Sequence, residues 1–306
     1  MDPETWSAWG QAAAADILPA YRKSAVGYLR EMFGHRPLAD FRIAIDCGGG
    51  MSGLVTPQVL DSLGGDTVTL NATIDSSFSA RSSKPTKESL QSFLRFIKTS
   101  GVDIGIAHDG DGDRLVVVDE YGEICHEDTI LAAVAREYVL RADQMDPVII
   151  TTPNVSARVE QVVEAEGGSV DYVPLGGIPD RISSPAEGSV VFAGEPWKHV
   201  HPRFGSWMDA VVSAGVISCL AKQAGSLEAL FANIPSYQYR KEQISCPDER
   251  KAGAMERIRR TLPQHFSNAV IQDEFGMKLW FGDVSWVLVD LVGQSRTSVS
   301  MVREQF

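Results

Sequence analysis

Three aspartates alternate with glycines in residues 108–114, which read His-Asp-Gly-Asp-Gly-Asp-Arg. A short run of mostly apolar, β-branched residues lies on each side, so this stretch is predicted to be a tight loop between two buried strands. The glycines let the backbone curl, and the carboxylates of Asp109, Asp111 and Asp113 can then turn toward one point. Three converging carboxylates repel one another unless a cation lies between them. A hard divalent ion, most simply Mg²⁺, relieves the repulsion and leaves room for a phosphate oxygen.

This loop has two other interpretations besides a magnesium site. An acidic surface turn explains most single Asp-Gly pairs, but three alternating aspartates between apolar strands are harder to explain in that way. A calcium-binding EF-hand loop starting at Asp109 would have Glu120 at its twelfth position. That loop needs glycine at the sixth position, where Arg114 stands, and helices on both sides. The magnesium site is therefore favoured, and the planar guanidinium of Arg114 is placed to grip the same phosphate.

With its flanks, the loop resembles the metal-binding loop of the α-D-phosphohexomutases, the family of phosphomannomutase, phosphoglucomutase and phosphoglucosamine mutase. The likeness extends from about residue 40 to residue 289 and is strongest at the loop. It implies that Asp109, Asp111 and Asp113 hold Mg²⁺. It also implies that Arg114 steadies the phosphate being transferred and that the substrate is a hexose phosphate.

A second loop, residues 194–199, is similar to the Gly-Glu-x-Ser-Gly-His loop with which the family contacts sugar hydroxyls. Here it reads Gly-Glu-Pro-Trp-Lys-His. The resemblance implies that Glu195 and His199 orient the sugar. Trp197 and Lys198 replace the usual serine and glycine, so Trp197 could stack on a pyranose face and Lys198 could meet a phosphate. The alternative is a surface loop whose tryptophan packs on its neighbours.

Strand and helix patterns alternate along most of the chain, which is typical of α/β proteins with mostly parallel sheets. Strands are expected at 41–46, 68–70, 102–107, 115–119, 147–152, 170–173, 190–193, 278–281 and 285–288, with another near 244. Helices are expected at 5–33 (one or two), 55–63, 87–99, 129–140, 156–166, 210–221 and 250–262. The glycine-rich turn 47–53 could cradle a phosphate or be a plain tight βα turn, and the resemblance implies a structural role. Asp209 is expected to be a helix N-cap.

The fold class is therefore α/β, with two consecutive αβα domains of mixed or parallel sheets followed by a smaller, incomplete α+β domain. The expected boundaries are a helical lead-in at 1–38, a metal-binding domain at 39–145, a sugar-binding domain at 146–236 and a partial C-terminal domain at 237–306. The second αβα unit is expected to be another copy of the first. The resemblance assigns the lead-in to the end of a first domain.

Two departures from the family pattern bear on function. The family transfers phosphate through a phosphoserine in a Thr-Ala-Ser-His-Asn-Pro-like loop, and none of the 306 residues forms such a loop. The family also grips the other phosphate with an Arg-Pro-Ser-Gly-Thr-Glu-Pro loop after the segment that corresponds to 286–289. One consistent codon choice for residues 289–301, read in another frame, encodes that motif and the strand after it. Residues 290–306 are therefore hypothesised to be an out-of-frame translation, without the apolar pattern to complete a sheet.

The composition of the chain limits the kinds of partner and cellular location that can be expected for it. The formal net charge is −12, which argues against nucleic-acid binding, since that needs a basic face. No apolar run is long enough to span a membrane, and the acidic N-terminus predicts no secretory signal. The four cysteines form no Cys-x-x-Cys pair, which fits a reducing cytoplasm.

The leading hypothesis is a phosphohexomutase-type protein that moves phosphate between C1 and C6 of a hexose but is inactive alone. One alternative is a non-catalytic protein that binds Mg²⁺ and sugar phosphate. Another is one subunit of a split mutase, whose separately encoded first domain docks on the lead-in helix. An exposed apolar face on that helix would favour docking.

Overall fold

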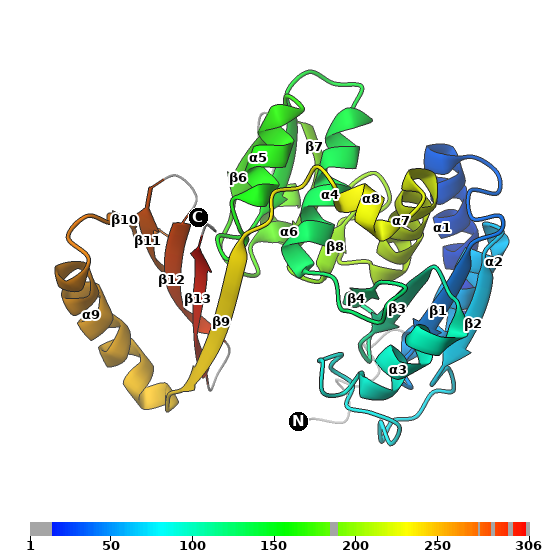
Figure 1. The fold of residues 1–306 in the computed structure, drawn as a ribbon, viewed down its shortest axis with the longest axis horizontal. Helices are drawn as coiled ribbons and strands as arrows, with labels where there is room; N and C mark the ends of the chain where they lie inside the picture. The colour runs from blue at the N-terminus through cyan, green and yellow to red at the C-terminus, as the bar shows by residue number, and fades with distance from the viewer. Residues whose placement is uncertain (1–13, 184–188, 275, 283–284, 293–295, 304–306) are drawn as a thin grey trace, which may run out of the picture.

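The computed structural model describes residues 14–183, 189–274, 276–282, 285–292 and 296–303. Within these residues the strands form three sheets, two of four strands and one of five (Figure 1). The first two sheets belong to α/β units, as predicted, and the third lies toward the C-terminus. Among the described residues, no helix combines the length and apolar character needed to cross a bilayer.

The first sheet has the strand order β2-β1-β3-β4. Its strands are β1 (Arg42–Asp46), β2 (Asp66–Leu70), β3 (Ile104–His108) and β4 (Leu115–Val118). β1 pairs in parallel with both β2 and β3, and β4 runs antiparallel to β3. The connections contain a 3₁₀ helix (Met51–Leu54), α2 (Thr56–Ser62) and α3 (Gln91–Ser100). Every residue of β3 and β4 is buried, so the acidic loop between them has a rigid base.

The second sheet has the order β6-β5-β7-β8 and repeats the arrangement of the first. Its strands are β5 (Pro147–Thr151), β6 (Ser169–Tyr172), β7 (Ser189–Glu195) and β8 (Lys198–Val200). β5 again pairs in parallel with two neighbours, and β8 is antiparallel to β7. The prediction of a second copy is confirmed. The turn between β7 and β8 thus occupies the position that the acidic loop occupies between β3 and β4.

In the described part of the chain, five further helices accompany the two α/β units, besides the central helix 210–224 described below. They are α1 (Leu18–Phe33), α4 (Glu127–Leu140), α5 (Arg158–Ala165), α6 (Ile178–Ser183) and α8 (Leu227–Phe231). α4, expected to close the first unit, packs on α5 and β7 of the second sheet. The apolar face of α1 packs on α2 and α7, so the exposed face that would favour docking is largely covered. Residues 1–13 lie outside the described part of the chain.

The two α/β units share one hydrophobic core around α7 (Ala210–Ala224). All residues from Ala210 to Ala221 are buried, and α7 contacts β3 and β4 on one side and β8 on the other. Gly215 lets α1 approach closely, because a Cβ there would lie 2.4 Å from Leu29 Cδ1. The site residues of both units are therefore held on a single packed body.

The third sheet is antiparallel, in the order β10-β11-β12-β13-β9, and projects from the two α/β units (Figure 1). It comprises β9 (Gln238–Ser245), β10 (Val270–Gln272), β11 (Met277–Phe281), β12 (Ser285–Val292) and β13 (Arg296–Arg303), with α9 (Asp248–His265) alongside. The expectation that nothing beyond residue 289 completes a sheet was wrong, because β13 pairs with both β12 and β9. The hydrogen bonds between neighbouring strands are formed by backbone N–H and C=O groups, so strand pairing does not require an apolar side-chain pattern. This pairing does not test the reading-frame hypothesis, which concerns codons.

Candidate metal and sugar-phosphate site

The three aspartates converge as the sequence predicted. One carboxylate oxygen from each of Asp109, Asp111 and Asp113 lies within 4.8 Å of the other two. The loop leaves the carboxyl end of β3, and Gly112 adopts a positive φ of 75° that favours glycine. Gly50 of the glycine-rich turn packs on Gly110. A Cβ added at Gly50 would lie 2.5 Å from the Gly110 carbonyl oxygen. That turn therefore supports the acidic loop from the side.

The carboxylates fit a divalent cation. Asp113 Oδ1 is buried and has no hydrogen-bond partner among the residues described, and Arg114 Nε lies 3.9 Å from it. Burial raises the pKa of Asp109 to about 6, with the neighbouring charges of Asp113 and Asp111 adding to the effect and the Arg114 backbone N–H opposing it. A bound cation would offset this concentration of negative charge. Three hard oxygen ligands in one loop suit Mg²⁺.

Three charged residues surround Asp113. Arg114 Nε lies 3.7 Å from Asp109 Oδ2, and the Arg114 side chain is 38% exposed. Lys198 forms an ion pair with Asp113 from the neighbouring unit. Glu195 is close to both cations; burial raises its pKa, while Lys198 and Arg114 oppose that shift. Thus the fold brings Arg114, Glu195 and Lys198 to the acidic loop, although the Lys198 amine contacts a carboxylate instead of facing an open phosphate position.

The β7–β8 turn carries backbone strain. Trp197 has a φ of 67°, at a turn position where glycine or asparagine is usual. A bulky side chain in this conformation costs about 1 kcal/mol. The indole packs on an apolar cluster of the first unit. The Trp197 carbonyl accepts a 3.1 Å bond from the Leu115 N–H, so the turn and the end of the acidic loop are directly joined.

His199 lies beneath the turn. It is 1% exposed, and neither ring nitrogen has a hydrogen-bond partner among the described residues. Burial lowers its pKa to about 3, so the ring is neutral near pH 7. It packs edge-on against Phe192 with ring centroids 5.3 Å apart. Its predicted role in orienting a sugar stays a prediction.

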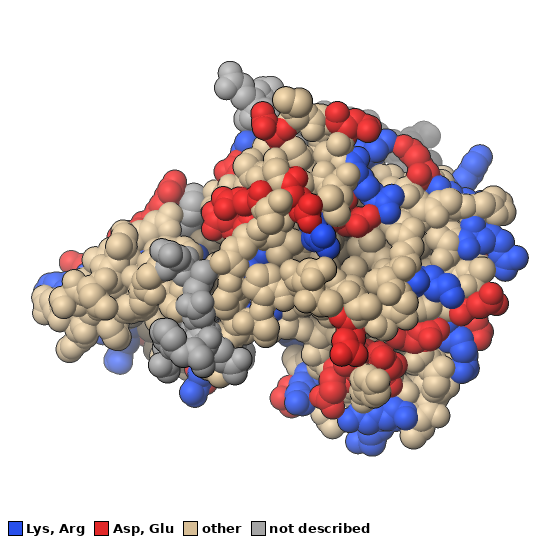
Figure 2. Space-filling model, turned by 45° about the horizontal axis from the view of Figure 1, so that its top comes forward, with Lys and Arg blue, Asp and Glu red and all other residues tan. Residues whose placement is uncertain are grey.

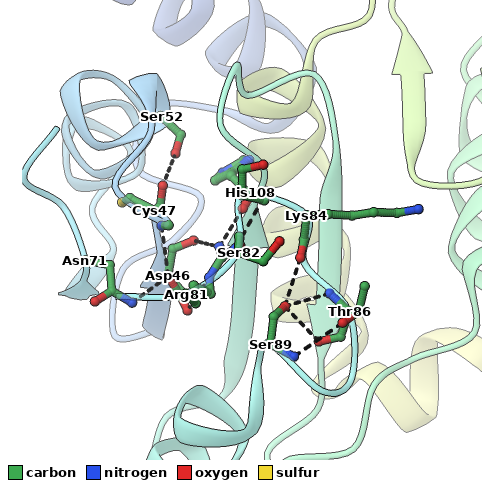
Figure 3. A network of polar contacts seen from close by, with 12 residues as sticks. Asp46, Cys47, Ser52, Asn71, Arg81, Ser82, Lys84, Thr86, Ser89 and His108 are labelled. Carbon is green, nitrogen blue, oxygen red and sulfur yellow. Dashed lines mark hydrogen bonds and ion pairs between the residues drawn. The ribbon is translucent and has the colours of Figure 1, made fainter. Parts of the chain in front are cut away.

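A buried network around Arg81 holds the acidic loop and was missed in the sequence (Figure 3). Arg81 Nε lies 3.0 Å from Asp46 Oδ2 at the end of β1, and Arg81 Nη2 donates 2.6 Å to the His108 carbonyl at the end of β3. His108 Nδ1 lies 3.2 Å from the Arg114 carbonyl, and its Nε2 lies 3.2 Å from Thr56 Oγ1. Arg81 and His108 therefore fix the two ends of the loop. Arg81 stands in a Ser-rich segment that predicted only a connection.

Asp209 acts as the N-cap of α7, as predicted, because its Oδ1 accepts a 2.9 Å bond from the Val212 N–H. It also accepts a bond from the Tyr21 hydroxyl.

On the face drawn in Figure 2, basic side chains form separate groups interrupted by acidic and uncharged residues. That distribution differs from the continuous basic face of nucleic-acid-binding proteins.

Comparisons of the sequence with known proteins point to one family of enzymes. Residues 26–122 match the model of phosphoglucomutase/phosphomannomutase alpha/beta/alpha domain II. A phosphopentomutase of Thermococcus kodakarensis is 32% identical over 276 residues, which are 90% of this chain and 59% of that protein. A probable phosphoglucosamine mutase of Methanopyrus kandleri is 34% identical over 252 residues, 81% of this chain and 54% of that protein. This chain thus spans under two thirds of each relative.

The fold comparison agrees. The structure is similar to that of a phosphoglucomutase/phosphomannomutase family protein of Burkholderia thailandensis, with a TM-score of 0.81 at 19% identity. That match covers 98% of this chain and 64% of the other chain. The acidic loop, the duplicated sheets and the sequence matches agree, and this chain belongs to the α-D-phosphohexomutase family.

Proposed function

We propose that this chain carries the metal-binding and sugar-phosphate-binding part of a phosphohexomutase-type site. The observation that carries the proposal is the set of three convergent carboxylates, in which the buried Asp113 Oδ1 lies beside Arg114 and has no hydrogen-bond partner among the described residues. The names of the relatives in Thermococcus and Methanopyrus support a sugar-phosphate mutase. The substrate is a hexose phosphate in this proposal, and the phosphopentomutase relative makes a pentose phosphate the natural comparison.

Each site residue has a role in this proposal. Asp109, Asp111 and Asp113 would hold Mg²⁺, which would supply positive charge to offset the negative charge of a phosphoryl group. Arg114 contacts that phosphoryl group through its guanidinium. Glu195 accepts sugar hydroxyls, Trp197 offers a ring face, and His199 shapes the pocket from below. Lys198 is released from Asp113 when a divalent cation takes that carboxylate.

We infer that these 306 residues bind substrate without turning it over. No serine among them stands in the family's phosphoserine context, so phosphoryl transfer needs a serine from outside this sequence. A cavity of about 240 Å³ beside Asp111 favours a docked serine-bearing domain over a solitary binding protein. Its walls include the exposed side chains of Ile17, Met51 and Trp207. A docked domain there would reach the acidic loop.

Magnesium binding tests the first part of the proposal, that the three aspartates hold a divalent cation. In calorimetric titration with MgCl₂, the wild-type chain should bind one ion, and Asp113→Asn should weaken binding by about tenfold or more because an anionic ligand is lost. Asp66→Asn makes the same change of charge at an exposed position on β2 and should leave the affinity unchanged. Equal magnesium affinity in wild type and Asp113→Asn would refute the proposed metal site.

Complementation tests the second part of the proposal, that turnover needs a serine-bearing domain from outside this sequence. Mixing the chain with a serine-loop domain from the Thermococcus relative should produce sugar-phosphate isomerisation that neither component shows alone. Changing that domain's serine to alanine should abolish turnover. Binding of sugar phosphate with no turnover in the mixture would instead support a non-catalytic binding protein. The DNA around codon 289 separately tests whether residues 290–306 are out of frame.

A further inference from the structure

The side chain of His108 ties the two ends of the acidic loop together. His108 is the last residue of β3, and its side chain is fully buried. Its Nδ1 lies 3.2 Å from the carbonyl oxygen of Arg114, six residues further along the chain and directly before β4. The imidazole thus joins the residue before Asp109 to the residue after Asp113. All three aspartates lie within the loop that this one contact closes.

The partners of the imidazole define its protonation. A carbonyl oxygen can only accept, so His108 Nδ1 carries a hydrogen and donates it to the Arg114 carbonyl. A positive ring would be buried close to the guanidinium of Arg81, whose Nη2 donates 2.6 Å to the His108 carbonyl (Figure 3). Burial disfavours the charged form further, so the ring is neutral. Its Nε2 is then an acceptor, and the Thr56 hydroxyl, 3.2 Å away, donates to it.

Thr56 gives the imidazole a fixed support. It is the first residue of α2 and is fully buried, and α2 packs on α1, α7 and β2. The 3₁₀ helix before α2 reaches the middle of the loop, because the Met51 N–H donates 3.0 Å to the Gly110 carbonyl. The loop is therefore held at its ends through His108 and between the first two aspartates through Met51.

The closed end also orients the first carboxylate of the site. The N–H of Arg114 donates 3.1 Å to Asp109 Oδ1, while the carbonyl of the same residue accepts from His108. The imidazole therefore fixes the residue that in turn fixes the Asp109 carboxylate. A phenyl ring at position 108 would fill a similar volume but would leave the Arg114 carbonyl without its donor.

The rigidity of a carboxylate loop affects divalent cations unequally. Mg²⁺ requires near-octahedral geometry with oxygens at about 2.0–2.1 Å, whereas Ca²⁺ accepts about six to eight oxygens at about 2.3–2.6 Å in flexible arrangements. A loop that is free to open can still surround the larger ion. It loses the short, regular contacts that the smaller ion needs.

We propose that His108, supported by Thr56, sets the preference of the acidic loop for Mg²⁺ over Ca²⁺. The inference rests on the proposed metal site and deepens it, because the aspartates supply the negative charge and His108 supplies their spacing. His108 binds neither cation nor substrate in this assignment. It is a positioning residue that acts through Arg114 and Asp109.

Separate calorimetric titrations with MgCl₂ and CaCl₂ test this assignment. The wild-type chain should bind Mg²⁺ more tightly than Ca²⁺. His108→Phe should weaken Mg²⁺ binding by about tenfold or more, because two hydrogen bonds of the imidazole are lost, and Ca²⁺ binding by about threefold or less. His108→Asn places its amide N–H near the position of Nδ1, so it should keep the bond to Arg114 and most of the wild-type preference.

A second pair of variants tests the support and does not alter the imidazole. Thr56→Val has nearly the same volume without the hydroxyl and should shift the preference in the same direction as His108→Phe, whereas Thr56→Ser should retain it. Thr69→Val makes the same change at an exposed position on β2 and should leave both affinities unchanged. Urea denaturation of each variant identifies those that are folded under the conditions of the titration.

Three outcomes would overturn the inference. They are a wild-type chain that binds Mg²⁺ no more tightly than Ca²⁺, folded variants at positions 108 and 56 that keep the wild-type ratio of affinities, and an equal loss of both cations. The last would mean that the imidazole supports the loop in general without selecting an ion. Any of these results with Mg²⁺ binding that depends on Asp113 would remove this inference alone. No Mg²⁺ binding by the wild-type chain would remove the proposed function as well.

Discussion

At the scale of single residues, the acidic loop depends on side chains that lie behind it. The Arg81–Asp46 pair is almost fully buried, with side-chain exposures of 4% and 2%. Arg81→Ala would leave Asp46 as an uncompensated buried charge, so the free energy of unfolding should fall by about 3–5 kcal/mol. Urea denaturation measures the change. Arg203→Ala removes the exposed pair with Glu31 and should cost less than about 1 kcal/mol. Similar costs for the two variants would contradict the anchoring role of Arg81.

The raised pKa of Glu127 predicts that the free energy of unfolding depends on pH. Burial, opposed by Lys241, raises its pKa from 4.5 to about 7. The folded state therefore binds this proton more readily than the unfolded state does. The stabilising contribution is fully present below pH 4.5 and is lost as the pH rises through 7. Glu127→Gln should therefore show a smaller fall in urea midpoint between pH 5 and pH 8 than the wild type.

Glu228→Gln is the control for that measurement, because Glu228 is exposed on α8. It should retain the wild-type pH profile. An unchanged profile in Glu127→Gln would mean that Glu127 titrates in the folded chain as it does in the unfolded chain.

At the scale of elements, the contact between α1 and α7 predicts opposite effects for two glycines. Gly215→Ala places a Cβ 2.4 Å from a methyl group of the fully buried Leu29, so unfolding should become easier by about 1 kcal/mol or more. Gly27→Ala, in α1, meets nothing within 4 Å and should stabilise the chain by about 0.5–1 kcal/mol through helix propensity. Thermal unfolding of both variants checks the signs. Stabilisation by both changes would show that α1 shifts freely on α7.

The elements also show what the sequence could and could not predict. The β3 and β4 strands were predictable because both are short, mostly apolar runs that contain Ile or Val, and the Asp-Gly alternation marked the loop between them. β8 was missed because its three residues are too short to show a period. Arg81 was missed because its partners, Asp46 and the His108 carbonyl, are 35 and 27 residues away. β13 was missed because a backbone ladder leaves little trace in a side-chain pattern.

At the scale of the whole molecule, one buried lysine joins the third sheet to the second α/β unit. Lys278 Nζ donates 2.9 Å to the Pro153 carbonyl and lies 4.2 Å and 4.3 Å from the ring centroids of Trp280 and Trp286. Lys278→Ala should loosen this attachment and raise the radius of gyration in small-angle X-ray scattering. Arg259→Ala, which removes an exposed pair with Asp273, should not. Equal radii for Lys278→Ala and wild type would show that other contacts suffice.

The repeated sheet order has a consequence for how such a protein can evolve. Both turns that carry chemistry, the acidic loop and the Pro196–Trp197 turn, occupy the same position in two copies of one scaffold. The strands beneath them are buried and intolerant of change, whereas the turns add few contacts to the common core. Selection can therefore alter one turn while the other keeps its chemistry. The repeated scaffold thus separates the turns that can diversify from the strands that must stay constant.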